Sequence, residues 1–168
     1  MSVIDTLVTD RTQSDIDYIN TLKNKIMQEG IGALTLQEYT DYFSSPKGCY
    51  NYTDLNRVGE ACNYLYNIFL DYGYCSSDYT VLRTDWTYTD TFEKQDMLEY
   101  INSVKALKAL FNATQTVPST LINLNYEQAN NIEKLLIQLD DMIDSMSQIF
   151  LRPNISWSYS GAQFYIKN

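Results

Sequence analysis

The residues of this chain that could do chemistry on their own are carboxylates crowded near residue 140. Asp140 and Asp144 are one helical turn apart, with Asp141 beside them. Two facing carboxylates can hydrolyse a glycosidic bond, and carboxylate oxygens suit a hard cation. The simpler explanation is a solvated acidic face opposite Ile143 and Met146. We therefore expect no catalytic residue and no metal site here, and an ion held by Asp140 and Asp144 remains an open alternative.

Other catalytic systems lack their essential residue types. The chain has no histidine, which removes the commonest general base and the Ser-His-Asp and Cys-His nucleophile systems. No two cysteines have the CxxC spacing of a zinc site, and Gly30 and Gly32 lack the rest of a phosphate-binding loop. Cys49, Cys62 and Cys75 are expected to be free thiols. We expect a protein that is not an enzyme and that has no cofactor.

A second polar set lies along residues 53 to 72. Its members fall off the apolar stripe of that segment, and they are Asn56, Arg57, Glu60, Asn63 and Asn67. They can form either an ordered network between helices or a contact surface, and we favour the structural use. A buried Arg57 would need an acidic partner such as Asp54 or Asp85, because an unpaired buried charge is very costly.

Aromatic side chains are the strongest candidates for a contact surface. The chain has 15 tyrosines, and tyrosine combines a large ring with a hydroxyl, which favours interfaces. The candidate contact residues are Tyr74, Tyr79, Trp86, Tyr88, Trp157, Tyr159, Phe164 and Tyr165. Trp86 has an alternative role, in which its ring plugs one end of a helical bundle and anchors the loop around it.

A central helix is predicted to organise the fold. Apolar residues recur at steps of three and four from Leu55 to Tyr72, which is the spacing of one buried helical face. We expect Thr53 to cap the start of this helix and Gly73 to end it.

Further helices flank the central one. Their expected limits are Thr12 or Ser14 to Gly30, Leu36 to Phe43, Phe92 or Lys94 to Asn112, and Asn125 to Phe150. Thr35 and Glu38 match a capping box, and Asn125 and Gln128 come close to one. The predicted fold class is mainly α: a helical bundle of three long helices plus one short helix, with a long ordered loop and a short C-terminal strand or hairpin.

The remaining segments are predicted to connect or to dock. Residues 74–96 should form a long ordered connection, with a short strand at Tyr79 to Leu82, and such loops are often functional surfaces. Residues 1–11 are a candidate docking arm. Residues 154–168 alternate aromatic and small residues, which predicts a strand or hairpin that needs a partner, either its own bundle or another subunit. We expect one domain spanning residues 1–168.

The net charge and the hydropathy of the chain limit the classes of partner that we expect. A net charge of −9 would be repelled by nucleic acid and by anionic membranes. We see no signal peptide, and no apolar segment approaches the roughly 20 residues that span a bilayer. A soluble protein that partners neither nucleic acid nor membrane is therefore expected.

Six segments, in order, form a recognisable set: TDRTQSD at 9–15, GCYNYTDLNRV at 48–58, ACNYL at 61–65, TDWT at 84–87, YEQANNIEKL at 126–135 and YSG at 159–161. Together they resemble a family of virion structural proteins from phages and prophages of low-GC Gram-positive bacteria. Proteins of this family are usually described as minor structural or tail proteins. The family often ends in Ser-Gly-Glu or Ala-Gly-Glu, whereas Ala162 and Gln163 follow Gly161 here. The resemblance implies a role in assembly without a known catalytic residue.

Two functions follow as hypotheses. The first is a non-enzymatic virion protein, associated with a phage tail or baseplate, that is assembled in the host bacterial cytoplasm and contacts itself and other virion proteins as a homo-oligomer. The alternative is a module that binds a glycan or protein of the host cell surface through the Tyr74 to Thr91 loop and Trp86. An enzyme that uses only carboxylates is the weakest option.

Overall fold

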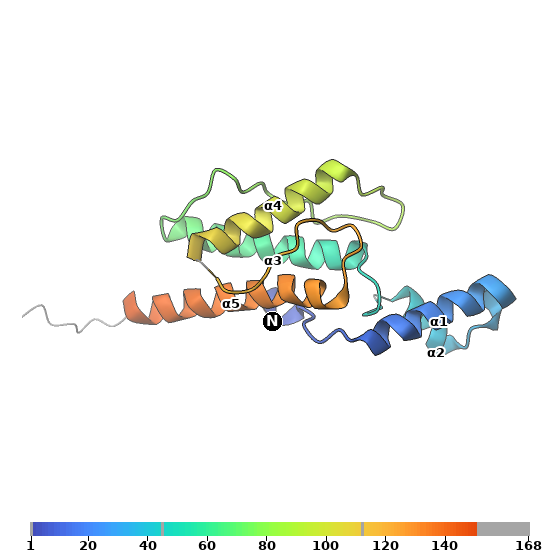
Figure 1. The fold of residues 1–168 in the computed structure, drawn as a ribbon. Helices are drawn as coiled ribbons and strands as arrows, with labels where there is room; N and C mark the ends of the chain where they lie inside the picture. Colours follow the sequence, from blue (N-terminus) through green and yellow to red (C-terminus); the bar gives the residue numbers. More distant parts are fainter. Residues whose placement is uncertain (1, 45, 112, 151–168) are drawn as a thin grey trace, which may run out of the picture.

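The described residues of this computed structural model are 2–44, 46–111 and 113–150, and they are helical throughout their regular parts (Figure 1). The helices are η1 (Ile4–Thr6), α1 (Gln13–Glu29), η2 (Ile31–Ala33), α2 (Leu36–Phe43), α3 (Tyr52–Asp71), α4 (Lys94–Phe111) and α5 (Tyr126–Phe150). The described ranges contain no strand. The prediction of a mainly α fold is confirmed.

Three long helices, α3, α4 and α5, form a bundle in which all three run in the same direction (Figure 1). Near their C-terminal ends, the rings of Phe69 in α3 and Phe111 in α4 lie 4.7 Å apart. Near their N-terminal ends, Arg57 of α3 bonds Glu133 of α5. Parallel neighbours cannot be joined by a short turn, so the chain must return along the bundle after each helix. This requirement explains the long connections that precede α4 and α5.

The hydrophobic core lies between these three helices. The apolar stripe predicted for the central helix is buried from Leu55 to Phe69, with Val58, Cys62, Leu65 and Phe69 fully enclosed, but its last member, Tyr72, is 40% exposed at the end of α3. The buried members pack with buried residues of α4 and α5 and with Ile4, Leu82 and Trp86 from the connecting segments. Ile4 belongs to the segment predicted as a docking arm, so this arm contributes to the core of its own chain.

Helix caps follow the sequence with one correction. Thr35 and Glu38 form the expected capping box, and Thr12, one of the two predicted caps of α1, forms a further box with Asp15. Gly73 takes a positive φ of 84° after α3. The cap of α3, however, is Asn51 rather than Thr53. The Asn51 side chain accepts from the backbone N–H of Thr53, which itself lies in the first turn of α3.

Helices α1 and α2 pack against each other beside one end of the bundle (Figure 1). We call residues 13–44 the α1–α2 hairpin. Ile19 and Leu22 are the buried residues of α1, and no residue of α2 is buried. The hairpin is therefore an appendage of the bundle and not a fourth layer of its core.

Two predictions about regular structure are wrong. The described chain has four helices of 17 to 25 residues, not three long ones, because α1 is nearly as long as α4. The strand at Tyr79 to Leu82 is absent, because the backbone there pairs with side chains of α3 and α4 in place of another strand. The predicted C-terminal strand or hairpin lies outside the described residues.

Candidate functional site

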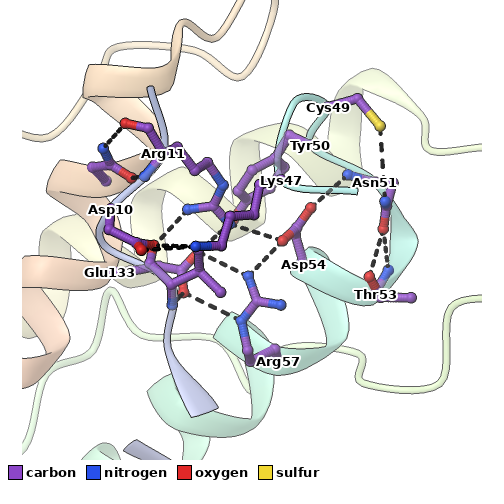
Figure 2. Close-up of polar contacts among 12 residues, drawn as sticks. Asp10, Arg11, Lys47, Cys49, Tyr50, Asn51, Thr53, Asp54, Arg57 and Glu133 are labelled. Carbon is purple, nitrogen blue, oxygen red and sulfur yellow. Dashed lines mark hydrogen bonds and ion pairs between the residues drawn. The ribbon is translucent and has the colours of Figure 1, made fainter. Parts of the chain in front are cut away.

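Four charged side chains meet where the N-terminal segment, α3 and α5 converge (Figure 2). Arg11 Nη2 lies 2.8 Å from Asp54 Oδ1 and 2.6 Å from Glu133 Oε1. Arg57 bonds the same two carboxylates, with Nη2 3.0 Å from Glu133 Oε1. We call these four residues the ion cluster. Its two positive and two negative charges balance, which is the condition under which charges tolerate burial.

The ion cluster holds the N-terminal segment against α5. Glu133 Oε2 accepts from the backbone N–H of Val8 at 2.5 Å. The amide of Asn130 accepts from the Arg11 N–H at 3.1 Å and donates to the Arg11 carbonyl at 2.9 Å. Residues 8–11 are thus fixed by their own chain, which leaves little of the predicted docking arm free for a partner.

Protonation behaviour in this region is set by burial and by the cluster. Burial opposes the charge of Arg57, but hydrogen bonding and attraction from Glu133 and Asp54 raise the pKa of its guanidinium above the ordinary value. Beside it, the hydroxyls of Tyr50 and Tyr100 lie 2.6 Å apart. Burial raises the pKa of both phenols, so both stay neutral. The region is a structural junction between the N-terminal segment, α3 and α5.

The loop at residues 46–50 places the α1–α2 hairpin relative to the bundle. Lys47 Nζ lies 2.7 Å from Asp10 Oδ2 in an exposed pair. Gly48 lies so close to α1 that a Cβ there would collide with the Asp15 carbonyl and the Ile19 side chain. Only glycine permits this approach, so Gly48 fixes the position of the hairpin.

The connection between α3 and α4 is tied to the bundle by side-chain amides. Asn63 donates to the Leu82 carbonyl at 2.8 Å and accepts from its N–H at 2.9 Å. Asn56, two helical turns earlier, makes the same paired contact with Trp86, both bonds being 2.8 Å. We call residues 79–86 the strap. The polar set of the central helix is thus used structurally, as we favoured, at Asn56, Arg57 and Asn63.

Trp86 acts as the anchor of this strap. Its side chain is only 8% exposed, its ring meets Phe92 edge-on at 5.0 Å, and the guanidinium of Arg83 lies 4.2 Å above it. A sugar-stacking platform needs an accessible ring face, whereas the Trp86 ring is almost entirely buried and Arg83 lies over it. The plugging role that we weighed as the alternative is the one that this geometry fits.

The other predicted contact residues differ in exposure. Tyr79 stacks on Tyr66 at 3.9 Å and donates to Asn63 at 2.8 Å, so it belongs to the strap. Tyr74 is 39% exposed and Tyr88 is 84% exposed. Trp157, Tyr159, Phe164 and Tyr165 lie outside the described residues. The structure therefore leaves Tyr88 and Tyr74 as the accessible members of the described part of the set.

An exposed apolar surface on α2 was missed by the sequence reasoning. Leu36, Tyr39 and Phe43 are 85%, 46% and 48% exposed, and their spacing places them on one side of the helix. We call them the α2 face. Its signal was in the sequence, as a short apolar stripe, but a stripe does not tell whether the chain itself covers it.

A groove lies where the hairpin meets the start of α3. It has a cavity volume of about 640 Å³ and is lined by Ile19, Asn20 and Lys23 of α1, Tyr42 and Phe43 of α2, Pro46, Gly48 and Cys49, Asn51 to Thr53, and Tyr88. We call it the hairpin groove. A smaller hollow of about 300 Å³ adjoins it and shares Asn51, Tyr52 and Tyr88. Exposed Tyr88 therefore stands at the rim of both.

The acidic residues near position 140 do not assemble a site in the described part of the chain. Asp140 is half-buried, whereas Asp141 and Asp144 are exposed. Burial, followed by the negative charges of Asp144 and Asp141, raises the pKa of Asp140. Among residues 2–44, 46–111 and 113–148, no group of three or more acids or cysteines is placed to hold a metal ion.

The cysteines of the described chain are free thiols, as predicted. Cys49 and Cys75 are exposed, and Cys62 is buried in the core. Burial raises the pKa of the Cys62 thiol, so it behaves as a small apolar side chain.

No helix in the described ranges combines the length and hydrophobicity required to cross a bilayer. Comparison of the chain with protein-family models, with curated proteins and with solved structures finds no match.

Proposed function

We propose that this chain is a non-enzymatic structural protein of a phage virion, associated with the tail or baseplate, that acts through protein–protein contacts. The observation that carries the proposal is the α2 face. Leu36 is 85% exposed, and no residue of α2 is buried in the chain. An amphipathic helix with its apolar side in water is typical of a surface that a partner covers.

The rest of the molecule supports a docking role over a catalytic one. The ion cluster, the strap and Trp86 make contacts that hold the bundle together. The sequence has no histidine to act as a general base. The resemblance to virion structural proteins points to the same class. We propose other virion proteins and further copies of the chain as partners, within particles assembled in the host bacterial cytoplasm.

The test is incorporation into particles. Purified virions from a host carrying the gene should contain the chain by mass spectrometry, in a fixed ratio to the major tail protein. Leu36→Glu should lower this ratio at least tenfold, because a charge cannot be buried in an apolar contact. Leu98→Glu on α4, where Leu98 is 43% exposed, is the matched control and should leave the ratio unchanged.

Absence of the wild-type chain from particles would overturn the proposal. Equal loss from Leu36→Glu and Leu98→Glu would overturn the role of the α2 face, provided that both variants keep the helical circular dichroism of the wild type.

A second candidate is a module that binds a host-surface glycan or protein. The observation in its favour is Tyr88, which is 84% exposed beside two hollows that also contain Tyr52 and the amide of Asn51. Exposed tyrosine rings and amides are suited to sugar recognition. Tyr88→Ala should abolish binding of the purified chain to host cell walls, whereas Tyr72→Ala, at a tyrosine that is 40% exposed, should not.

A further inference from the structure

We propose that residues 151–168 of one copy of this chain dock in the hairpin groove of a second copy, with Trp157 and Tyr159 as the anchoring side chains. This inference rests on the proposed assembly function and names the contact that would link copies. The hairpin groove supplies a cavity of about 640 Å³, within the range of about 300–1,000 Å³ that is usual for well-formed pockets.

The groove has the composition of an interface core. Ile19, Tyr42, Phe43, Tyr52 and Tyr88 line it, and aromatic residues are enriched where proteins bury surface against partners. Phe43, Tyr52 and Tyr88 are 48%, 36% and 84% exposed. Large rings that remain in water around a hollow are the arrangement expected when another aromatic segment fills it.

The segment after α5 has the complementary composition. Residues 151–168 contain Trp157, Tyr159, Phe164 and Tyr165, and their charged side chains are Arg152 and Lys167, without an acid. The α1–α2 hairpin has five acids and two bases in residues 13–44. The acidic hairpin as a whole favours the approach of a basic segment. The groove itself is lined by Lys23 and by no acid, so the contact inside it is made by aromatic and apolar side chains.

Chain geometry indicates that the occupant comes from a second copy. The start of α5 lies against the loop at residues 47–50, because Asn125, Tyr126 and Gly48 line one hollow. The end of α5 points away from the hairpin (Figure 1). With 25 residues, α5 is about 37 Å long. Trp157 follows Phe150 by seven residues, which span at most about 25 Å, so it cannot return to its own groove.

A tail that docks in the groove of the next copy makes a head-to-tail contact. Such contacts are heterologous, and they close into rings or continue as filaments. Each copy then offers one groove and one C-terminal segment. A copy with both of these blocked cannot join a ring or filament. A mixture of one variant with a blocked groove and one with a blocked segment can still form a single groove–segment contact.

Crosslinking through the native Cys49, which lines the groove, tests this. The donor chain carries Ser158→Cys with Cys49→Ser and Cys75→Ser. The acceptor chain carries Trp157→Ser, Tyr159→Ser and Cys75→Ser, and it keeps Cys49. Cys62 is buried in both. A short bismaleimide should join donor to acceptor as a heterodimer.

Tyr88→Arg in the acceptor should lower the heterodimer yield at least tenfold, because it places a bulky cation at the rim of the groove. Tyr72→Arg is the control and should leave the yield unchanged.

Three results would overturn the inference. One is the absence of a heterodimer, and another is a heterodimer that forms equally well with Tyr88→Arg. The third is crosslinking within one chain when Ser158→Cys and Cys49 are combined in a monomer, which would make the segment an intramolecular one. The chain could still be found in virions in each case, so the proposed function stands or falls separately by mass spectrometry of particles.

Discussion

At the scale of single residues, Glu133 is the side chain on which the buried charges converge. It is fully buried, and its two oxygens accept from Arg11, Arg57 and the Val8 N–H. Burying a carboxylate costs free energy of folding. Removing this one would cost more, because the guanidinium groups of Arg11 and Arg57 would then have only the Asp54 carboxylate between them.

Glu133→Gln should therefore lower the free energy of unfolding by about 3–5 kcal/mol, the usual cost of removing one member of a buried ion pair. Urea unfolding followed by circular dichroism measures it. Glu60→Gln is the matched control, since Glu60 is exposed on α3, and it should change the stability by less than about 0.5 kcal/mol. Equal stability of the two variants would mean that the ion cluster does not hold the N-terminal segment.

Glu38 offers a test by pH. The backbone hydrogen bond from Thr35 and the ion pair with Lys25 lower its pKa to about 2, from an ordinary value of 4.5. A carboxyl whose pKa is lower in the folded chain than in the unfolded chain stabilises the fold at pH values above the unfolded pKa. Its contribution is lost as the pH falls from about 4.5 through about 2. A carboxyl carbon titration by NMR should place the Glu38 midpoint near 2, and Lys25→Met should raise it, while a midpoint near 4.5 would contradict the capping box.

At the scale of elements, the strap shows how a long connection becomes ordered without a sheet. Asn63 pairs with both backbone groups of Leu82 and accepts from the Tyr79 hydroxyl. Ser103 of α4 pairs likewise with Thr80 through bonds of 3.1 and 2.8 Å. These side chains provide the hydrogen bonds to the strap backbone that a neighbouring strand would provide in a sheet.

Asn63→Ala should release the strap. The Leu82 N–H and carbonyl would lose their partners, and each unsatisfied buried group costs about 1–3 kcal/mol. Unfolding in urea and cleavage of residues 76–90 by a protease report the loss. Asn67→Ala, one turn away at an exposed position, is the control. If both variants are cleaved at the wild-type rate, the asparagine pairing does not order the strap.

Gly48→Ala tests how the hairpin is positioned. The new methyl group would overlap the Asp15 carbonyl and Ile19, so α1 must move, at about 1–3 kcal/mol for overpacking. Gly32→Ala is the control, because nothing lies within 4 Å of a Cβ at Gly32. Thermal unfolding should distinguish the two, and a wild-type melting temperature for Gly48→Ala would contradict the close contact.

At the scale of the whole molecule, the parallel bundle places the N-terminal ends of three helices at one pole. Asp54, Asp96 and Glu127 lie in the first turns of α3, α4 and α5, where acids interact favourably with the helix dipoles. The buried side chains are concentrated in the bundle, while the α1–α2 hairpin buries few.

Hydrogen exchange should therefore divide the chain into two units. Amides of α1 and α2 should exchange at least tenfold faster than those in the middle of α3 and α5, because elements with few buried contacts open locally. Mass spectrometry of the exchanged chain measures this. Uniform protection across residues 13–150 would show that the hairpin opens only with the bundle.

The sequence by itself predicted the helices and most of their ends, since periodicity and capping are local. It identified most of the apolar face of α3 and the cap at Thr35. It offered Thr12 as one of two possible caps and Asp54 as one of two possible partners of Arg57, and the structure selects both. It missed Glu133 as the other partner of Arg57, because no local signal links positions 76 residues apart. For the same reason it treated Trp86 and Tyr79 as candidate contacts, although both are held within the strap.

Only the tertiary structure decided which surfaces remain open. The carboxylates near residue 140 do not form a group placed to hold a metal ion in the described chain. The α2 face and the hairpin groove became visible only when the parallel arrangement of α3, α4 and α5 had placed α1 and α2 outside the core. An apolar stripe in the sequence indicates that a helix has an apolar face. Whether that face is covered by the chain itself or by a partner depends on how segments distant in the sequence pack.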